Sequence, residues 1–378
     1  MQKKKTIPVF RPSFGKEEVQ AVARVLESGW AGLGPKTAEF EGAFSEFVKA
    51  PYSVAVNSCT SALHCALATL DLRPGDEVIT SPITFVSSAH AIAYCGAKPV
   101  FTDVEPDTLN MDPTKLEKVI TKRTRAILCV HYAGHPCDIS RLQSIAASHK
   151  IPLMEDAAHA CGARYKGTPI GGTGNLTCFS FHAVKNLACG DGGMVTAFSK
   201  QTDRWLRKMR WLGIDKSTWN RALGKKYSWY YSVTDLGFKY HMNDITAAIG
   251  LVQLGKLERA NCKRRRLVEN YNRELSSVPW ITLPVEKEYA RSSWHIYKIE
   301  VPTRRIREKL IRYLNGNAVS AGVHYYPIHL HDFYQKQKRI CLPVAEEKWQ
   351  KIVTLPLFPD LSRADQERII HALKKFSV

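Results

Sequence analysis

The feature that most constrains the fold is an alternation of short apolar stretches and helical stretches between residues 53 and 154. The predicted strands lie at 53–56, 77–80, 99–102, 126–131 and 151–154. The helical stretches between them lie at 62–70, 86–94, 113–120 and 139–149. Apolar strands separated by helices are typical of parallel βαβ units, so we predict an α/β fold with a mostly parallel sheet flanked by helices. Two more strands, at 177–181 and 194–197, are expected close to an edge of this sheet.

The remainder of the chain predicts a second, smaller domain at the C-terminus. Further helices are expected at 16–28, 37–48, 204–210, 244–275, 306–314, 344–351 and 363–376. Strand signals follow the long helix at 294–301 and 318–324. We therefore expect a large domain at 1–250 with an N-terminal arm at its start, and a small α+β domain at 251–378. The stretch 211–235 is aromatic, basic and irregular, and is expected to form a surface or interface loop.

The net charge of +19 limits the classes of partner that need to be considered. A strongly basic chain binds nucleic acid, steers another acidic ligand, or is simply well solvated. The basic runs at 263–266 and 304–309 fall in predicted helices and are interpreted as solvated faces, because no nucleic-acid-binding signature accompanies them. We expect an acidic small-molecule substrate. A non-catalytic regulatory protein that binds DNA is the alternative from a different class.

The sequence contains no signal for secretion or membrane insertion. It begins with MQKKKTIPVFRP, which is basic and then polar. The longest segment free of Lys, Arg, Asp and Glu, 78–97, contains Pro82 and several hydroxyl residues, which indicates buried strand and helix rather than a membrane span. The ten cysteines form no CxxC pair and most lie in apolar runs. We expect a reduced, cytoplasmic protein without disulfides.

Two groups of histidines could suggest a metal site. They comprise His131, His135 and Cys137, and His324, His329 and His331. Both groups lie around prolines, and neither has the helical HExxH or the closed CxxC spacing of zinc sites. We therefore predict no metal.

A lysine between an apolar strand and a glycine turn is the first candidate for catalysis. The stretch 178–193 reads CFSFHAVKNLACGDGG and presents Ser180, His182 and Lys185 before its glycines. A lysine becomes a nucleophile near neutral pH when burial or a neighbouring cation lowers its pKa. An ordinary solvated lysine is the alternative, so the case depends on the surrounding residues.

Two upstream motifs supply a carboxylate and an anion site. Asp156 follows the predicted strand 151–154, and the carboxyl ends of strands in α/β sheets are where ligands bind. The segment NSCTSALHCAL places Thr60 and Ser61 at the start of a helix, where hydroxyls and free amides attract anions or simply cap the helix. A lysine, a carboxylate and an anion site together are what pyridoxal phosphate requires.

At this point the chain resembles the DegT/DnrJ/EryC1/StrS sugar aminotransferases, which are pyridoxal phosphate enzymes of fold type I. The resembling motifs occur in order over nearly the whole chain: GWAGLGPKTAEFE (29–41), NSCTSALHCAL (57–67), SPITFVSSAHAI (81–92), GAKPVFTDVEPDTLNMD (96–112), EDAAHACGARYKG (155–167), FSFHAVKNLACGDGGMV (179–195), GFKYHMNDITAAIGLVQL (237–254) and HYYPIHLHDFY (324–334). The resemblance implies an aspartate aminotransferase-like large domain that binds the cofactor.

The resemblance also implies roles for the cofactor-site residues. Lys185 is expected to hold pyridoxal 5'-phosphate as a Schiff base and, once freed, to move a proton during transamination. Asp156 is expected to keep the pyridinium nitrogen protonated. Thr60, Ser61 and Ser180 are expected to hold the phosphate.

Four further residues complete the expected site. Asn243 reaches the phosphate from a second subunit, which implies a homodimer with active sites at its interface. Phe85 stacks on the cofactor ring, with plain core packing as the alternative. His159 lies near the ring hydroxyl, and His182 contacts substrate or tunes Lys185.

The expected substrate is a nucleotide-linked keto-deoxyhexose of amino sugar or polysaccharide biosynthesis, aminated from an amino acid that the resemblance identifies as glutamate. Trp30 is expected to cover the sugar-nucleotide site, and His324, Tyr325 and His329 to face the substrate. The segments 240–244 and 229–231 favour amination at C4 over C3.

One related activity remains an alternative, and another is disfavoured. Aminotransferases of keto-cyclitols (inososes) share the scaffold and are the alternative activity. Some relatives replace the lysine with histidine and are sugar dehydratases, which Lys185 argues against here.

Overall fold

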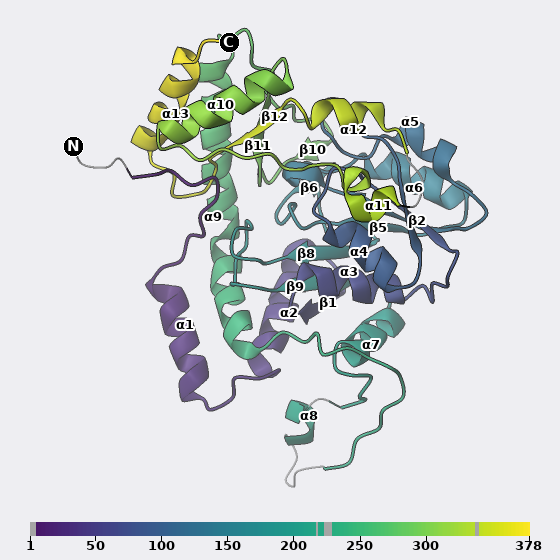
Figure 1. The fold of residues 1–378 in the computed structure, drawn as a ribbon. Coiled ribbons are helices and arrows are strands. Elements are labelled where there is room, and N and C mark those ends of the chain that lie inside the picture. Colours follow the sequence, from purple (N-terminus) through teal and green to yellow (C-terminus); the bar gives the residue numbers. More distant parts are fainter. Residues whose placement is uncertain (1–4, 217, 223–228, 337–339) are drawn as a thin grey trace.

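The structure is a computed structural model that describes residues 5–216, 218–222, 229–336 and 340–378. A seven-stranded sheet forms its centre (Figure 1), and its strands are β1 Tyr52–Val56, β2 Glu77–Thr80, β3 Lys98–Phe101, β4 Thr124–Val130, β5 Leu153–Asp156, β8 Leu176–Ser180 and β9 Gly193–Ala197. The strand order is β1-β9-β8-β5-β4-β2-β3. All neighbouring pairs from β8 to β3 are parallel, and only β9 runs antiparallel to its neighbours. The prediction of a mostly parallel α/β sheet is confirmed.

One of the two strands expected near an edge lies farther inside than the sequence suggested. β9 lies next to the edge strand β1, as expected, but β8 pairs with β5 on one side and β9 on the other. The reason is that β9 turns back antiparallel to β8 and then pairs with β1, which takes the edge. β8 is therefore an inner strand of the sheet.

The helices cover the sheet and continue into the C-terminal region (Figure 1). They are α1 Lys16–Glu27, α2 Pro35–Val48, α3 Cys59–Ala68, α4 Ser87–Tyr94, α5 Pro113–Leu116, α6 Ile139–Ser148, α7 Lys200–Met209, α8 Thr218–Ala222, α9 Asp244–Leu275, α10 Arg304–Gly316, α11 Asp332–Gln335, α12 Pro343–Lys348 and α13 Arg363–Lys375. Short 3-10 turns lie at Glu117–Val119, Tyr132–Gly134 and Ile328–Leu330. Within the described ranges, none of the helices has both the length and the apolar character that a bilayer crossing demands.

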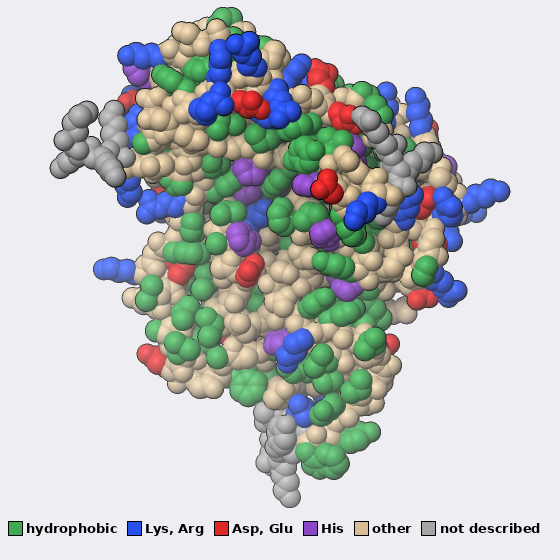
Figure 2. Space-filling model, in the orientation of Figure 1, with side chains coloured by type: hydrophobic (Ala, Val, Ile, Leu, Met, Phe, Trp, Pro, Cys, Tyr) green, Lys and Arg blue, Asp and Glu red, His purple; other side chains and the backbone are tan. Residues whose placement is uncertain are grey.

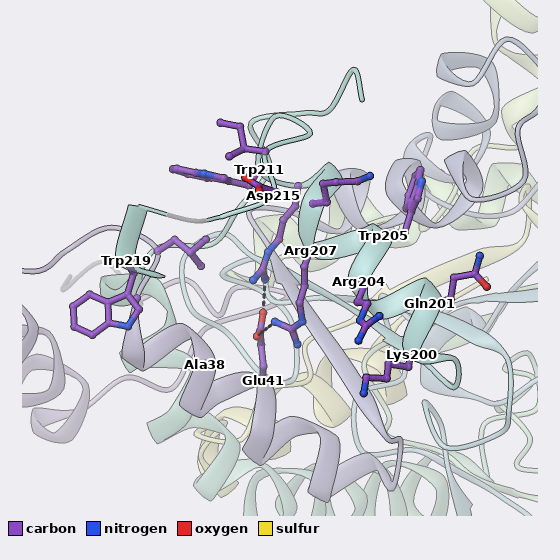
Figure 3. A pocket seen from close by; sticks show the side chains of 15 residues that line it. Ala38, Glu41, Lys200, Gln201, Arg204, Trp205, Arg207, Trp211, Asp215 and Trp219 are labelled. Carbon is purple, nitrogen blue, oxygen red and sulfur yellow. Dashed lines mark hydrogen bonds and ion pairs between the residues drawn. The ribbon is translucent and has the colours of Figure 1, made fainter. Parts of the chain in front are cut away.

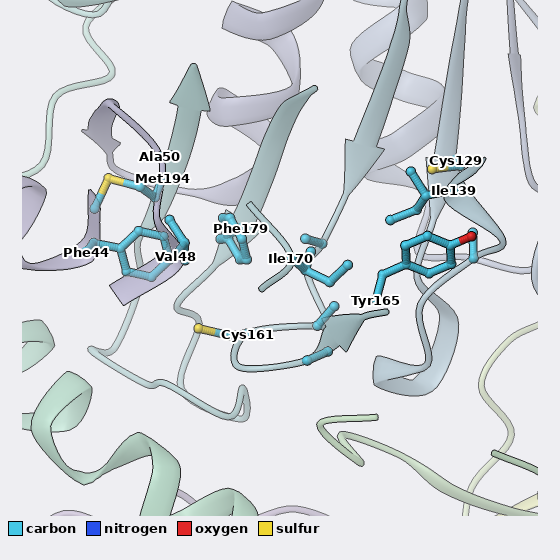
Figure 4. Packing of buried hydrophobic residues seen from close by; sticks show 14 of the residues in the cluster. Phe44, Val48, Ala50, Cys129, Ile139, Cys161, Tyr165, Ile170, Phe179 and Met194 are labelled. Carbon is cyan, nitrogen blue, oxygen red and sulfur yellow. The ribbon is translucent and has the colours of Figure 1, made fainter. Parts of the chain in front are cut away.

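Aromatic and aliphatic side chains fix α2 against the sheet (Figure 4). Phe44 of α2 is fully buried, and its ring meets that of Phe179 of β8 edge-on at 5.0 Å. Val48 and Met194 lie in the same buried cluster. Removing a buried phenylalanine of this kind costs about 3–5 kcal/mol. This packing holds the strand that precedes Lys185 rigidly in place.

An ion cluster joins α2 to α7 (Figure 3). The buried Glu41 of α2 accepts hydrogen bonds from Arg207 Nη1 at 2.5 Å and from Arg210 Nη1. The amide of Ala55 in β1 donates to the same carboxylate at 2.9 Å. Glu41, Arg207 and Arg210 line a pocket of about 740 Å³ together with Trp205 and other residues.

The C-terminal region has its own small sheet and core. β11 Tyr297–Glu300 and β12 Ile352–Leu355 pair antiparallel, and α10 and α13 pack with them in a separate buried cluster. A second small sheet consists of β6 Arg164–Tyr165, β7 Thr168–Pro169 and β10 Ala290–Arg291. The helix α9 spans from the large sheet to this region, so the boundary predicted at residue 250 falls inside a continuous helix.

The predicted strand at 318–324 is wrong. Within that stretch only isolated bridges form, from Val319 to Ile7 of the N-terminal arm and from Gly322 to Thr354. Ala318 adopts a left-handed φ of 55°, which interrupts an extended strand. The arm makes a further backbone contact where the amide of Leu357 donates to Val9 at 3.0 Å.

Candidate active site

The carboxyl ends of the parallel strands gather the predicted cofactor residues along one edge of the sheet. Asp156 is the last residue of β5 and Ser180 the last residue of β8. Phe85 lies in the loop between β2 and α4, and Thr60 in the first turn of α3 after β1. This is the edge where open α/β sheets bind ligands, and Lys185 follows β8 at the same edge.

Lys185 is held in a turn whose backbone amide donates to the carbonyl of His182 at 2.9 Å. Burial lowers the pKa of its amine from 10.5 to about 8, while Cys59 and Asp156 act in the opposite direction. A lysine with such a pKa is present in both the ammonium and the amine form near neutral pH. It can therefore act as a nucleophile and as a proton carrier.

Asp156 is a buried carboxylate with two hydrogen-bond donors. Ser88 Oγ of α4 donates to its Oδ2 at 2.7 Å, and the amide of Ala158 donates to its Oδ1 at 3.0 Å. Burial raises the pKa of this carboxyl, and the two donors together with Lys185 oppose the rise. A carboxylate held in this way can pair with a cationic ring nitrogen.

Hydroxyl groups cluster at the start of α3. Ser58 caps the helix by accepting from the amide of Ser61 at 3.1 Å, and Ser61 Oγ donates to Asn57 Oδ1 at 2.6 Å. Thr60 Oγ1 lies 2.8 Å from Ser87 Oγ at the start of α4. The N-cap of α3 is therefore Ser58, whereas Thr60 links two helix N-termini. Two such termini and several hydroxyls make a site for a dianion such as phosphate.

A close backbone approach brings β9 to this cluster. A Cβ on Gly193 would lie 2.5 Å from the carbonyl oxygen of Ser58, so only glycine fits between β9 and the start of α3. Gly193 also pairs with Ser180 across the β8–β9 ladder. The buried Ser180 and the hydroxyl cluster are thus neighbours of the same glycine.

A group of rings closes the other side of the site. His159 Nε2 lies 3.2 Å from the hydroxyl of Tyr325, and their rings are stacked at 5.9 Å. The ring of His295 lies 4.5 Å from that of His159. Burial lowers the pKa of His159 well below its ordinary value, so its ring is neutral, and its buried Nδ1 has no partner among the described residues. On the side of the molecule drawn in Figure 2, several histidine side chains lie near the middle.

The structure separates the remaining candidates into two groups. Phe85 is 59% exposed with its ring 6.3 Å from that of Tyr325, which is not the environment of a core residue. His324, through its Nδ1, lies 2.9 Å from Thr354 Oγ1 beside the same rings. His182 is exposed next to Lys185.

Three candidates lie away from these contacts. Asn243 is the exposed N-cap of α9, and its side chain accepts from the amide of Thr246 at 2.8 Å. Trp30 donates to the carbonyl of Leu33 at 3.1 Å and packs edge-on against Trp219.

His329 is the third of these candidates. It is buried, its Nε2 lies 3.1 Å from Glu346 Oε1, and it packs beside Phe101. Within the described residues its contacts do not include Lys185, Asp156 or His159.

The first histidine group that suggested a metal is occupied by protein contacts. In the described ranges one set with metal-ligating atoms within 4.8 Å exists, namely Cys129, His131 and Cys137. The amide of Cys137 donates to His131 Nδ1 at 3.1 Å, which leaves the ring proton on Nε2, 2.7 Å from Glu155. His135 Nε2 likewise accepts from the amide of Lys287 at 3.0 Å. Neither ring has a free lone pair for a metal.

Comparison with known proteins identifies the family. The model of the DegT/DnrJ/EryC1/StrS aminotransferase family matches residues 12–374. The chain belongs to this family. The spore coat polysaccharide biosynthesis protein SpsC of Bacillus subtilis is 40% identical over 97% of this chain and 96% of its own length.

Solved structures of aminotransferases share the fold closely. The aminotransferase TlmJ of Streptoalloteichus hindustanus is 34% identical, with a TM-score of 0.91 over 97% of each chain. The sugar aminotransferase Spr1654 of Streptococcus pneumoniae, described as putative, is 31% identical in its pyridoxal phosphate form, with a TM-score of 0.91 over 98% of each chain. The family and this structure confirm the fold-type I prediction and the expected cofactor, pyridoxal 5'-phosphate.

The residues of this aminotransferase fit that cofactor. An amine with a lowered pKa, a buried carboxylate and a hydroxyl cluster at two helix starts match its aldehyde, its ring nitrogen and its phosphate. The unpartnered Nδ1 of His159 is a further polar atom that a bound ligand could satisfy.

Sequence reasoning missed three residues that the fold brings to the site of the aminotransferase. Ser88 lies three residues after Phe85 in a quoted motif and could have been found as a hydroxyl on the same helix start. Cys59 adjoins Thr60 and acts on the pKa of Lys185. His295 had no local signal, because it enters the site from a segment far along the chain.

Proposed function

We propose that this chain is a pyridoxal phosphate-dependent aminotransferase that moves an amino group from glutamate to a keto carbon of a nucleotide-linked keto-deoxyhexose, with C4 favoured over C3. The observation that carries the proposal is the half-buried Lys185, whose amine has a lowered pKa and acts electrostatically on the buried Asp156 at the ligand-binding edge of the sheet. The similarity to proteins described as sugar aminotransferases supports a sugar as the acceptor.

The residues of the chain divide the work. The cofactor, when bound, supplies an aromatic ring that takes up the electron pair left on the substrate carbon. Asp156, oriented by Ser88, keeps the ring nitrogen protonated. Thr60, Ser61 and Ser180 hold the phosphate. Lys185 takes the proton from the α-carbon of the donor and returns it at the cofactor carbon, which its pKa near neutrality allows.

Rings around the site exclude water and orient the substrate. His159 is neutral because it is buried, so it can accept a hydrogen bond from the cofactor hydroxyl without adding a charge. Phe85 covers one face of the ring. Tyr325 and His324 face the substrate, and the net charge of +19 attracts a nucleotide diphosphate from solution.

We further propose that the enzyme is a homodimer in which Asn243 contributes to the partner's phosphate site. Large apolar side chains are exposed in the segment before this residue, with Trp229 77% and Leu236 92% accessible. Exposed apolar side chains gathered in one segment mark an interaction surface. The exposed position of Asn243 at the start of α9 leaves its amide nitrogen available to a second chain.

The proposed activity has a direct test. The purified protein should be yellow, and its visible band should shift on addition of glutamate. The shifted form should then be returned by one member of a panel of 3-keto and 4-keto nucleotide hexoses. Return by a keto-inositol alone would contradict the nucleotide-sugar proposal. A colourless protein that retards a DNA probe at moderate salt would contradict the enzymatic proposal as a whole.

A further inference from the structure

A buried arginine without a partner lies beside Lys185. Arg264 of α9 is only 3% exposed, and its Nε and Nη1 make no hydrogen bond to any described residue. It lines a small cavity of about 30 Å³ together with Arg11, Pro12, Ser13, Lys185, Asn186, Gln253, Lys256, Ala260 and Pro359. A cavity of this size accommodates about two water molecules, or one group of carboxylate size.

The cavity is cationic and none of its lining residues is acidic. Lys256 is engaged elsewhere, by Glu17 and Glu18. The carboxylate that acts on Arg264 is that of Asp360, whose Oδ2 accepts from Ser13 and whose Oδ1 pairs with Lys263. Arg264 is thus a buried guanidinium without a bonded counter-ion, an arrangement that destabilises a fold unless a ligand supplies the charge.

Lys185 and the hydrogen-bonded side chain of Asn186 both line the cavity. Asn186, next to Lys185, donates to Asn261 and to the carbonyl of Ser293, each at 2.8 Å. Its Oδ1 lies 3.0 Å from Nδ1 of the buried His295. Burial is the main cause of the lowered pKa of His295, and Lys185 and Arg264 lower it further, so this ring lies within electrostatic range of both cations.

We propose that Arg264 binds the side-chain carboxylate of a dicarboxylic amino-acid donor. This inference rests on the proposed function. The α-carbon of the donor must reach Lys185, and the distal carboxylate of glutamate then lies roughly 4–5 Å farther along its side chain, given ordinary bond lengths. A guanidinium fork binds a carboxylate through two parallel hydrogen bonds, which a neutral donor such as alanine cannot form. Arg264 is therefore a specificity-determining residue for the amino donor.

The test compares Arg264→Gln with Arg266→Gln, an identical change at an exposed position of the same helix. The shift of the visible band is followed in single turnovers with glutamate and with alanine. In Arg264→Gln the preference for glutamate over alanine should fall by roughly 100-fold or more, while the single-turnover rate with alanine should change little. Arg266→Gln should match wild type, and Arg264→Lys should retain part of the preference.

Two measurements do not depend on turnover. Glutarate should raise the melting temperature of wild-type protein but not of Arg264→Gln, and butyrate should raise neither. Without ligand, Arg264→Gln should be at least as stable as wild type, because an unpaired buried charge has been removed.

The outcomes separate this inference from the proposed function. An unchanged preference for glutamate in a folded, yellow Arg264→Gln variant would overturn the assignment of Arg264 while leaving the aminotransferase intact. An equal fall in the single-turnover rates with glutamate and with alanine would also overturn the assignment of Arg264. Failure of wild-type protein to respond to glutamate would instead contradict the glutamate donor itself.

Discussion

Ser88 Oγ donates a hydrogen bond of 2.7 Å to Asp156 Oδ2, joining the start of α4 to the end of β5 beneath the buried site. Thr84 Oγ1 lies 3.0 Å from the same serine hydroxyl, so the donor is itself positioned by a neighbour. Because burial raises the pKa of Asp156, this bond is one of the few contacts that keep the carboxyl ionised. The charge of Asp156, which we propose pairs with the ring nitrogen of the cofactor, therefore depends in part on Ser88.

Ser88→Ala should impair catalysis without preventing cofactor binding. Loss of a hydrogen bond to a charged group costs about 1.5–3 kcal/mol, so the single-turnover rate with glutamate should fall by roughly ten- to a hundredfold. The rate should recover in part as pH rises, because the pKa of Asp156 is raised further in the variant. Ser81→Ala, which removes a buried hydroxyl without a partner in the described structure, serves as the control. A pH profile identical to that of wild type would exclude this role.

Lys185→Ala should lose both the covalent link to the cofactor and proton transfer. General acid–base catalysis alone contributes about 10²–10⁴-fold, so the rate should fall by at least that factor. The visible spectrum on addition of glutamate is the measurement. A normal spectral response in the variant would contradict the assignment of the nucleophile.

Lys185 should also make the stability of the cofactor-free protein depend on pH. The pKa of its amine is lowered by burial to about 8 in the folded protein, against 10.5 ordinarily. Between these values the unfolded chain binds a proton that the folded chain does not, so the free energy of unfolding rises with pH. Lys185→Met should therefore be more stable than wild type at pH 7, and the difference should vanish by about pH 10.5. Urea unfolding of both proteins across this range tests the sign, and parallel profiles would refute it.

Glu41→Gln should be strongly destabilising. Although burial opposes ionisation, Arg210 and Arg207 hold the pKa of Glu41 below its usual range, and removal of its charge leaves the buried Arg210 uncompensated. Breaking a buried ion pair in this way costs about 3–5 kcal/mol. Chemical denaturation measures the loss, and Glu39→Gln at an exposed pair on the same helix should cost less than about 1 kcal/mol.

Asn243→Asp should inactivate the partner's site in the proposed homodimer, because the added negative charge repels the phosphate. The helix cap should be kept, because aspartate also caps helices. Subunits carrying Asn243→Asp and subunits carrying Lys185→Ala should each be inactive alone. After mixing, half of the dimers should be hybrids with one intact site of two, which gives about a quarter of wild-type activity. No recovery on mixing would argue that Asn243 serves its own chain.

Local patterns in the sequence predicted much of the architecture. Periodicity and capping chemistry depend on neighbouring residues. They predicted the order of strands and helices, the placement of Asp156 at a strand end and that of Thr60 at a helix start. The helix Asp244–Leu275 was predicted with its observed bounds for the same reason. The strand at 318–324 failed because its pairing depends on partners far away in the chain.

The sequence by itself thus determined the mostly parallel sheet and the positions of Lys185 after one strand and of Asp156 at the end of another, because each is encoded within a few consecutive residues. Only the tertiary structure decided the pKa of Lys185, the donor that Ser88 provides to Asp156, and the neighbourhood of His295 and Arg264. These depend on burial and on contacts between segments that are distant in the chain. A local sequence pattern does not indicate which two distant side chains will be buried next to each other.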